Sequence, residues 1–472
     1  MTITVPTPST GLTAEQAAAR ESVYSTPLDR LDPGDPAGFS RQEMWWKFER
    51  LRAESPVHYT AEEHTEQGPY WSLTKWDDIM AADTDHETFS AQAGIVLRKP
   101  PEGEIETDID YKASALTGEL GAGPGQGAST AGTAEAAEAA EAARVRERNT
   151  IRSLLSMDPP EHEVHRSAVV DGVSPANLRS MEPLIRERAG AILDALPIGE
   201  EFDFVEHVSR DLTAMTLATL FDFPQEERKK LTHWSDVMTS VPGPDSIVKT
   251  QEEFDAQVQE FFQVFAGMFQ QRAQEEKRVD FVSLLAHSPH AKDFTFAELQ
   301  GDGIVLLVGG NDTTRNTISG SVYALNKFPA EYDKLRANPK LIPSMVSETI
   351  RWQTPLTHMM RVATRDVEIG GRTIRAGDRV ALWYVSGNRD EDKIENPYDY
   401  VIDRKNPRQH LSFGFGIHRC LGNRLAELQL RIIWEEMLAR FPRIEVVGEP
   451  AFSHNNFVKG YDSMTVVIPE KN

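Results

Sequence analysis

A segment near the C-terminus combines residue types that suit the binding of a redox-active metal cofactor. The run Phe-Gly-Phe-Gly-Ile-His-Arg-Cys-Leu-Gly, from Phe413 to Gly422, contains the only cysteine of the chain, Cys420. Apolar residues at helical spacing follow, so Cys420 is expected at a helix N-terminus, where free N–H groups and the helix dipole favour a thiolate. A thiolate is a strong axial ligand for haem iron. Gly414 and Gly416 would let the backbone approach a flat macrocycle, and Phe413 could shield the sulfur. The alternative, a structural cysteine before a helix, does not account for this pattern.

A second unusual pattern lies in the apolar segment 301–327, which has helical periodicity. Gly309 and Gly310 are followed closely by two threonines, and these are poor choices for the middle of a helix. The glycines could open a groove beside the helix, and Asp312 and Thr313 could pass protons through water. The alternative is an ordinary kinked core helix, and the residues alone do not decide between the two.

Glu348 and Arg351 are three residues apart in a predicted helix. Pairs at this spacing are common as exposed salt bridges. From the residues alone, the exposed pair is the favoured interpretation.

Composition restricts the class of protein. The formal net charge of the 472-residue chain is −23, which disfavours nucleic acid and anionic membrane as general partners. A single cysteine excludes an internal disulfide and fits a reducing compartment. The N-terminus has no apolar signal region, and no stretch approaches the roughly 20 apolar residues of a membrane span. A cytoplasmic protein without an integral membrane segment is expected.

The periodicity predicts a mainly α fold with a minor β part and a single domain. Residues 1–25 are expected to form a flexible N-terminal tail, and residues 26–472 the folded domain. Residues 114–143, a Gly/Ala/Ser run followed by an Ala-Glu repeat, are expected to be a low-complexity insertion in a loop. Helices are predicted near 39–52, 184–195, 207–220, 226–240, 252–276, 297–327, 330–353 and 422–440, and strands near 57–59, 70–74, 361–369, 373–375, 378–385 and 463–468.

The cysteine run matches the haem signature F-G-x-G-x-H/R-x-C-x-G, and by it the chain resembles the cytochrome P-450 superfamily. The segment from Gly309 to Thr313 resembles the oxygen-activation motif of that family. The resemblance implies a single-domain fold with a long central helix over the haem and small β-sheets. It also implies that Cys420 binds the iron of heme b (iron protoporphyrin IX), that Thr313 hydrogen-bonds bound dioxygen and that Asp312 feeds protons inward.

The same resemblance assigns further residues to the haem environment. Cations are expected around the haem propionates, because these groups are carboxylates. The family pattern gives that role to four side chains, His162, Arg166, Arg361 and His418, and gives haem contacts to Phe413, Gly414 and Gly422. It makes Glu348, Arg351 and Arg404 a structural set that stiffens the haem pocket.

Several phrases, among them Leu217-Ala-Thr-Leu-Phe-Asp-Phe-Pro and Asn456-Phe-Val-Lys-Gly-Tyr, resemble the bacterial alkane terminal hydroxylases. The resemblance implies a dioxygen-dependent monooxygenase that hydroxylates the terminal (omega) carbon of medium-chain alkanes or fatty acids. The expected pocket residues are Ile95, Val96, Leu97, Val305, Val308, Gly309, Leu356, Met359 and Phe457. Three alternatives stay open: a monooxygenase of terpenoids or sterols, a non-catalytic haem sensor or carrier, and a haem-free scaffold.

No flavin or iron–sulfur motif occurs in the sequence, and one cysteine cannot hold a cysteine-ligated cluster. Electrons are therefore expected from NAD(P)H through separate redox proteins, a ferredoxin and a ferredoxin reductase. A basic face around the cysteine would attract an acidic ferredoxin, although a solvated helix face is equally compatible with the pattern. The cations between residues 403 and 431 are Arg404, Lys405, Arg408, Arg419, Arg424 and Arg431, against Asp403 and Glu427.

Overall fold

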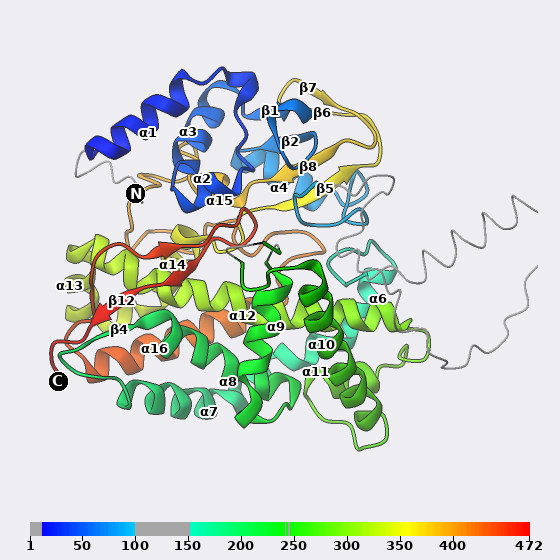
Figure 1. The fold of residues 1–472 in the computed structure, drawn as a ribbon, viewed down its shortest axis with the longest axis vertical. Helices are drawn as coiled ribbons and strands as arrows, with labels where there is room; N and C mark the ends of the chain where they lie inside the picture. The colour runs from blue at the N-terminus through cyan, green and yellow to red at the C-terminus, as the bar shows by residue number, and fades with distance from the viewer. Residues whose placement is uncertain (1–11, 100–151, 241, 244–245) are drawn as a thin grey trace, which may run out of the picture.

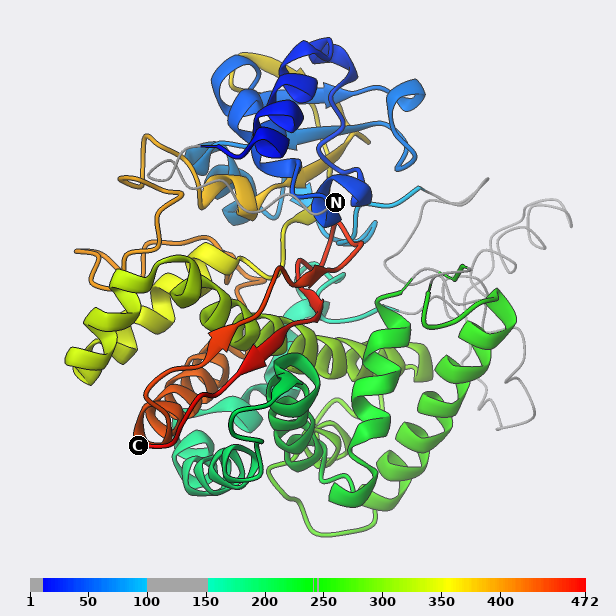
Figure 2. The same ribbon diagram turned by 60° about the vertical axis from the view of Figure 1, so that its left-hand side comes forward.

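The computed structural model describes residues 12–99, 152–240, 242–243 and 246–472. One side of the molecule carries the N-terminal helices and the largest β-sheet, and the other side is helical (Figures 1 and 2). The long helix α12 (Phe296–Lys327) crosses the middle of the molecule between them (Figure 1). The mainly α, single-domain fold and the long central helix are as the sequence predicts.

Helix α12 has 32 residues and a well-defined start. Thr295 and Glu298 form a capping box, in which each side chain accepts a hydrogen bond from the other residue's backbone N–H. Most of the helix is buried, because other helices contact it along its length. These are η4 (Val205–Arg210), α8 (Asp211–Phe221), α9 (Lys229–Met238), α10 (Gln251–Arg272), α13 (Pro329–Ala337), α14 (Ile342–Gln353) and α16 (Asn423–Arg440).

Proline is involved in two of the predicted helix boundaries that are wrong. Helix α7 (Pro175–Asp194) begins nine residues before the predicted 184, because Ser174 caps it and the helix continues through Pro183. The predicted helix 330–353 is three elements: α13, η6 (Pro339–Leu341) and α14. Pro339 has no N–H to donate within a continuing helix, so the chain restarts there.

The largest sheet has five strands in the order β1-β2-β8-β5-β3. The strands are β1 (Val57–Thr60), β2 (Tyr70–Leu73), β3 (Phe89–Ser90), β5 (Met359–Ala363) and β8 (Arg379–Leu382). Only β2 and β8 pair in parallel; the other neighbours are antiparallel. In this sheet Met359 pairs with Leu382 and Arg361 with Val380, so Arg361 lies on a strand between β8 and the edge strand β3.

The remaining elements are short. The small sheets are formed by β4 (Glu201–Asp203), β6 (Val367–Ile369), β7 (Arg372–Ile374), β9 (Glu445–Val446), β10 (Ala451–Phe452), β11 (Tyr461–Ser463) and β12 (Thr465–Val467). The other helices are η1 (Leu28–Arg30), α2 (Pro36–Ser40), α3 (Met44–Glu54), η2 (Glu62–His64), α4 (Trp76–Thr84), α6 (Glu161–Val169), η3 (Val170–Val173), η5 (Gln225–Glu227), α11 (Phe281–Ala286) and α15 (Tyr384–Gly387).

The N-terminal tail predicted for residues 1–25 is wrong for its second half. Helix α1 (Ala14–Ser25) begins with a capping box at Thr13 and packs on α3. Ala19 and Val23 are buried in this contact, so a modest apolar stripe is enough to fix the helix once α3 is beside it. The predicted insertion at 114–143 lies outside the described residues. Within the described parts of the chain, no helix combines the length and apolar character that crossing a bilayer demands.

Two large hydrophobic clusters form the core. One lies among the helices around α12, and the other lies around the five-stranded sheet. A cavity of about 2020 Å³ opens between them, lined by Val305 and Val308 on the helical side and by Leu356, Met359 and Phe457 on the sheet side.

Candidate functional site

Cys420 lies at the end of a tight loop that precedes α16. Gly414 and Gly416 have φ angles of +61° and +66°, a region that residues with a Cβ rarely adopt. The backbone N–H of Cys420 donates to the carbonyl of Phe413 at 2.8 Å, which closes the loop. Gly422 is the N-cap of α16, so Cys420 precedes the first helical turn, close to where the sequence predicts it.

The electrostatic surroundings of the Cys420 thiol act in opposite directions. Cys420 lines the cavity, and the surrounding protein, which displaces bulk water from the thiol, raises the pKa of Cys420 above its ordinary value. The N–H groups of Gly422 and Asn423 and the positive charges of Arg166 and Arg419 act to lower that pKa. The helix N-terminus therefore favours the thiolate. Because the desolvation effect is larger, the net shift of the Cys420 pKa is upward, toward the neutral thiol. A metal cation at the sulfur would reverse that balance.

The cavity of about 2020 Å³ contains Cys420 in its wall. This volume exceeds the 300–1,000 Å³ of common ligand pockets, so it has room for a large planar cofactor together with a substrate. All nine predicted pocket residues line it: Ile95, Val96, Leu97, Val305, Val308, Gly309, Leu356, Met359 and Phe457. Phe413, Gly414 and Gly422 also line it.

A group of histidine and arginine side chains lies beside the cysteine loop. His162 and Arg166 are on α6, Arg361 is on β5 and His418 is in the loop itself. The rings of His162 and His418 are 4.7 Å apart between centroids. Arg166 Nη2 donates to the carbonyl of Arg419 at 2.7 Å, which joins α6 to the loop. Arg166, Arg361 and His418 line the cavity.

These side chains have unused hydrogen-bonding capacity. Both ring nitrogens of His162 and of His418, and Nη1 of Arg166, are buried and have no hydrogen-bond partner within the described ranges. Burial and the charge of Arg166 lower the pKa of His162 to about 4, and burial and the charge of Arg361 lower that of His418. Buried unpaired polar groups are costly unless a ligand satisfies them. The cluster therefore fits a group with two carboxylates, as haem has.

The two glycines of α12 have different surroundings. A Cβ built on Gly309 would meet nothing within 4 Å, and this residue faces the cavity. A Cβ on Gly310 would lie 2.7 Å from Leu217 of α8. Gly309 therefore widens the cavity, whereas Gly310 allows the close approach of two helices. The Thr313 hydroxyl donates to the Gly309 carbonyl at 3.0 Å and also lies in the cavity wall.

Asp312 is buried, and several donors surround its carboxyl group. Arg315 is 3.0 Å from Oδ1, the Asn311 amide donates to Oδ1 at 3.0 Å, and the Ser235 hydroxyl donates to Oδ2 at 3.1 Å. Burial raises the pKa of Asp312 to about 6, with the charge of Arg315 opposing that shift. Arg315 also pairs with Asp236 of α9 at 2.7 Å, so α9 and α12 share one charge network.

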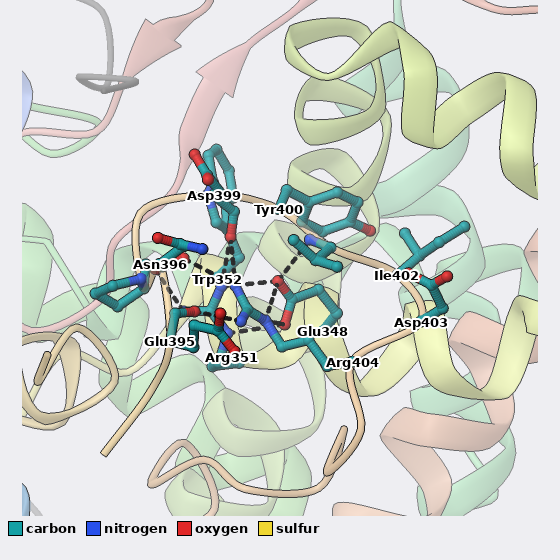
Figure 3. Close-up of polar contacts among 12 residues, drawn as sticks. Glu348, Arg351, Trp352, Glu395, Asn396, Asp399, Tyr400, Ile402, Asp403 and Arg404 are labelled. Atoms are coloured by element: carbon teal, nitrogen blue, oxygen red, sulfur yellow. Dashed lines mark hydrogen bonds and ion pairs between the residues drawn. The ribbon is translucent and has the colours of Figure 1, made fainter. Parts of the chain in front are cut away.

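The Glu348–Arg351 pair is buried, which corrects the surface salt bridge favoured from the residues alone. The Glu348 side chain is 0% exposed and that of Arg351 is 1% exposed. Arg351 donates twice to Glu348 at 2.8 Å, and Arg404 Nε lies 3.0 Å from each carboxylate oxygen (Figure 3). The Val401 N–H donates to the same carboxylate at 2.8 Å. These charges hold the pKa of Glu348 below its ordinary value despite burial.

The network extends to the cysteine loop. Arg351 donates to the carbonyls of Asn388 and Pro397 at 3.0 and 2.7 Å. The Asn388 side chain accepts from Leu411 N–H at 2.6 Å and donates to the Ser412 hydroxyl at 2.9 Å. Two hydrogen bonds, both made by Asn388, therefore join Arg351 to the start of the loop that ends at Cys420.

The predicted basic face is smaller than its residue count suggests. Arg404 forms an ion pair with Glu348 at 3.0 Å, and Arg431 is paired with Glu182 and Glu435 at 2.8 and 3.1 Å. Four exposed cations are left near the cysteine loop, Lys405, Arg408, Arg419 and Arg424, and one of them, Arg408, is paired with Glu427 at 3.3 Å.

Comparison with known proteins gives the decisive observation. The profile of the Cytochrome P450 family matches residues 130–459 of this chain. The chain belongs to the cytochrome P450 family. As a P450 monooxygenase it uses haem, dioxygen and external electron donors.

Several P450s are similar over most of their length. Linalool 8-monooxygenase of Pseudomonas putida is 30% identical over 94% of this chain and 100% of its own. The methyl-branched lipid omega-hydroxylase of Mycobacterium bovis is 28% identical over 89% and 90%. The solved structure of cytochrome P450-153 from Novosphingobium aromaticivorans is 36% identical, with a TM-score of 0.76 over 93% of this chain and 99% of its own.

Sequence reasoning missed several residues that lie around the predicted site residues. Arg315 follows Asp312 by three residues and could have been noticed as a helical neighbour. Asp236 lies on another helix, and nothing in its local sequence indicates the contact. The same is true of Asp83 and Tyr384, which contact the cysteine loop region from α4 and α15.

Proposed function

We propose that this P450 hydroxylates the terminal carbon of medium-chain alkanes or fatty acids. The observation that carries the proposal is the apolar wall of the cavity beside Cys420. Val308 lies on its helical side and Leu356 and Phe457 on its sheet side. Interior C–H bonds of a linear chain are weaker than terminal ones, so terminal selectivity requires walls that present only the methyl group. The similarity to a lipid omega-hydroxylase supports this substrate class.

A terpenoid substrate is the second candidate. The 30% identity to linalool 8-monooxygenase over the whole length of that enzyme favours it. A compact branched molecule would also be held by an apolar cavity, so the two candidates differ in the shape that the walls accept rather than in polarity.

In this proposal the cofactor is heme b, and Cys420 would hold its iron. When bound, a thiolate-ligated haem supplies the reductive activation of dioxygen and the insertion of one oxygen atom into a C–H bond. Phe413, Gly414 and Gly422, which line the cavity beside Cys420, would contact the macrocycle. The otherwise unpartnered nitrogens of His162, Arg166 and His418 would donate hydrogen bonds to the haem propionates, together with Arg361.

Thr313 and Asp312 serve proton delivery in this proposal. The Thr313 hydroxyl donates to a helix carbonyl at the edge of the cavity and can exchange that bond for one to a water or a substrate oxygen. Asp312 lies behind it, and its raised pKa of about 6 makes a transient protonated form accessible near neutral pH. Arg315 and Ser235 fix the carboxyl group between the helices.

Replacing Thr313 with alanine is expected to uncouple electron consumption from hydroxylation. Because the side-chain hydroxyl is lost while the apolar wall is kept, substrate binding stays within about twofold. Product per NADH falls by about tenfold or more, because the positioned proton-transfer group is lost, and hydrogen peroxide rises correspondingly. Thr313→Ser keeps the hydroxyl and should restore coupling. Equal coupling in the alanine and wild-type enzymes would show that Thr313 is structural only.

We propose that electrons reach this P450 from NAD(P)H through a ferredoxin reductase and a ferredoxin. Lys405, Arg408, Arg419 and Arg424 are exposed close to Cys420 in a chain of net charge −23. A local basic surface on an acidic protein would orient an acidic ferredoxin toward the nearest edge of the haem.

Product analysis with octane, dodecanoic acid and linalool tests the substrate proposal. With a ferredoxin, its reductase and NADH, the wild-type enzyme is expected to give mainly the terminal alcohol from the linear substrates. Phe457→Ala should raise the share of subterminal alcohol several-fold, because the chain end can then slide past the iron. Phe457→Leu, which keeps more of the wall, should shift it less. If linear substrates do not bind and linalool is converted, the proposal of terminal hydroxylation is wrong. The protein would then still be a monooxygenase, and the terpenoid class would be favoured.

A further inference from the structure

Asp83 is a buried carboxyl group that reaches the cysteine loop from a distant part of the sequence. It lies at the C-terminal end of α4 and is 5% exposed. Its Oδ2 accepts hydrogen bonds from the N–H of Phe415 at 2.7 Å and from the hydroxyl of Tyr384 at 2.9 Å. Its Oδ1 lies 3.4 Å from Nη2 of Arg361. One side chain therefore joins the cysteine loop, α15 and the arginine on β5.

The glycines of the cysteine loop allow this contact. A Cβ on Gly416 would lie 2.5 Å from the carbonyl oxygen of Asp83, and a Cβ on Gly414 would lie 3.3 Å from Asp83 Oδ2. Larger residues at these positions would force α4 away from the loop. The Phe413 carbonyl, two residues before the N–H that Asp83 binds, accepts the hydrogen bond from Cys420 N–H. Asp83 and that closing bond therefore both hold the same short loop.

The groups around Asp83 suit a carboxylate rather than a neutral acid. All three groups that face its oxygens, an N–H, a hydroxyl and a guanidinium, are donors. A protonated carboxyl would need an acceptor for its own hydrogen. Burial raises the pKa of Asp83, while Arg361, Phe415 and Tyr384 act to lower it. Tyr384 has a raised pKa, because it is buried beside this carboxyl, and acts only as a donor.

Arg361 lies between Asp83 and the cavity. Its Nη1 donates to the Met360 carbonyl at 2.8 Å, its Nη2 faces Asp83, and the side chain also lines the cavity. A cation that already has one carboxylate partner has a fixed orientation, and its charge is partly balanced before a second anion binds. Asp83 would therefore influence both the position of Arg361 and the net charge beside the haem.

We propose that Asp83 is a positioning residue of the haem site, which holds the cysteine loop and Arg361 in place and lowers the haem reduction potential through its negative charge. The inference rests on the proposed role of Cys420 and Arg361 in haem binding. An anion near the iron stabilises the ferric state relative to the ferrous state, because reduction removes one unit of positive charge. Burial limits the screening of that charge by water.

The test measures the ferric–ferrous reduction potential of the purified holoenzyme. Asp83→Asn removes the charge with little change in shape, and the ratio of ferrous to ferric enzyme at a fixed potential should rise about tenfold, which is about 59 mV for one electron. Asp77→Asn is the matched control, because Asp77 lies on the same helix and its side chain is 73% exposed. It should leave the potential unchanged, since water and salt screen an exposed charge.

Tyr384→Phe provides a second measurement if Asp83→Asn fails to retain haem. This variant keeps the charge of Asp83 and removes one donor that offsets it, so its potential should move in the negative direction. A merely structural contact would shift neither potential. The proposal is overturned if Asp83→Asn retains haem and has the wild-type reduction potential. If Asp83→Asn cannot be isolated with haem, the proposal is overturned when the reduction potential of Tyr384→Phe does not fall. The ferrous–CO spectrum of the wild type separately tests thiolate haem ligation, so failure of the proposed haem site is distinguishable from failure of this inference.

Discussion

The Cys420→Ala variant is expected to lose the thiolate-type spectrum of a P450 completely. Cys420 is the only thiol in the chain, so no other side chain can supply the same ligand. Thiolate donation shifts the Soret band of the ferrous–CO complex to the red and favours O–O cleavage. The variant should therefore show no red-shifted band, and product formation should fall below detection. The measurement is a ferrous–CO difference spectrum at matched haem content.

Arg424→Ala is the control for the cysteine variant. Arg424 is exposed in the first turn of α16, close to Cys420 in sequence. The Arg424→Ala variant should keep the wild-type ferrous–CO spectrum, because the substitution removes a surface charge and no ligand. A red-shifted band in Cys420→Ala would contradict the assignment of the axial ligand.

The Glu348→Gln variant is expected to lose much of the stability of the fold. It leaves Arg351 and Arg404 without their shared counter-charge, and breaking a buried ion pair costs about 3–5 kcal/mol. The network also holds the segment before the cysteine loop, so haem retention should fall with the free energy of unfolding. Urea unfolding of the holoprotein and the haem content per chain measure both effects.

Asp403→Asn is the matched control for Glu348→Gln. Asp403 directly precedes Arg404, one of the two arginines that contact Glu348. The Asp403 side chain is 46% exposed and pairs with Lys334. An exposed pair contributes about 0–1 kcal/mol. Comparable destabilisation by the two variants would mean that the buried network has no special role. If Glu348→Gln gives no holoprotein, Glu348→Asp, which keeps the charge, should give it in reduced yield.

The stability that Glu348 contributes is expected to depend on pH. The folded-state pKa of Glu348 lies below its ordinary value of 4.5. A depressed carboxyl pKa contributes stability that is fully present above the unfolded-state pKa and is lost as pH falls through the folded-state pKa. The stability difference between wild type and Glu348→Gln should therefore be constant near neutral pH and shrink below about pH 4.5.

The parts of the site that sequence alone predicted are contiguous in the chain. The cysteine loop, its glycines and the start of α16 follow from local backbone requirements, and the glycines at 414 and 416 have the positive φ angles that favour glycine. The glycines and Thr313 of α12 were recognised because they violate helix propensity within one apolar segment. In both cases neighbouring residues carry the signal, so tertiary contacts were not needed to detect it.

Contacts between distant segments could not be predicted in the same way. A Glu–Arg pair at i, i+3 has the same spacing on a surface as in a core, and only the packing of Arg404 and the chain around Asp399 buries Glu348. Asp236 and Asp83 are ordinary helix residues in sequence. They acquire their partners because α9 packs on α12 and α4 packs beneath the cysteine loop.

The sequence by itself predicted the long central helix and the membership of a haem-binding family, and it singled out Cys420 as the candidate ligand, because each depends on residue types at fixed local spacing. The tertiary structure decided which charges are buried. Arg404 and Arg431 are paired with carboxylates and do not contribute to the basic face. Helix α1 packs on α3, and donors from other elements surround Asp312 and Asp83. The physical reason is that the free energy of a charge depends on its solvation and its partners, and both are set by segments that meet only when the chain has folded.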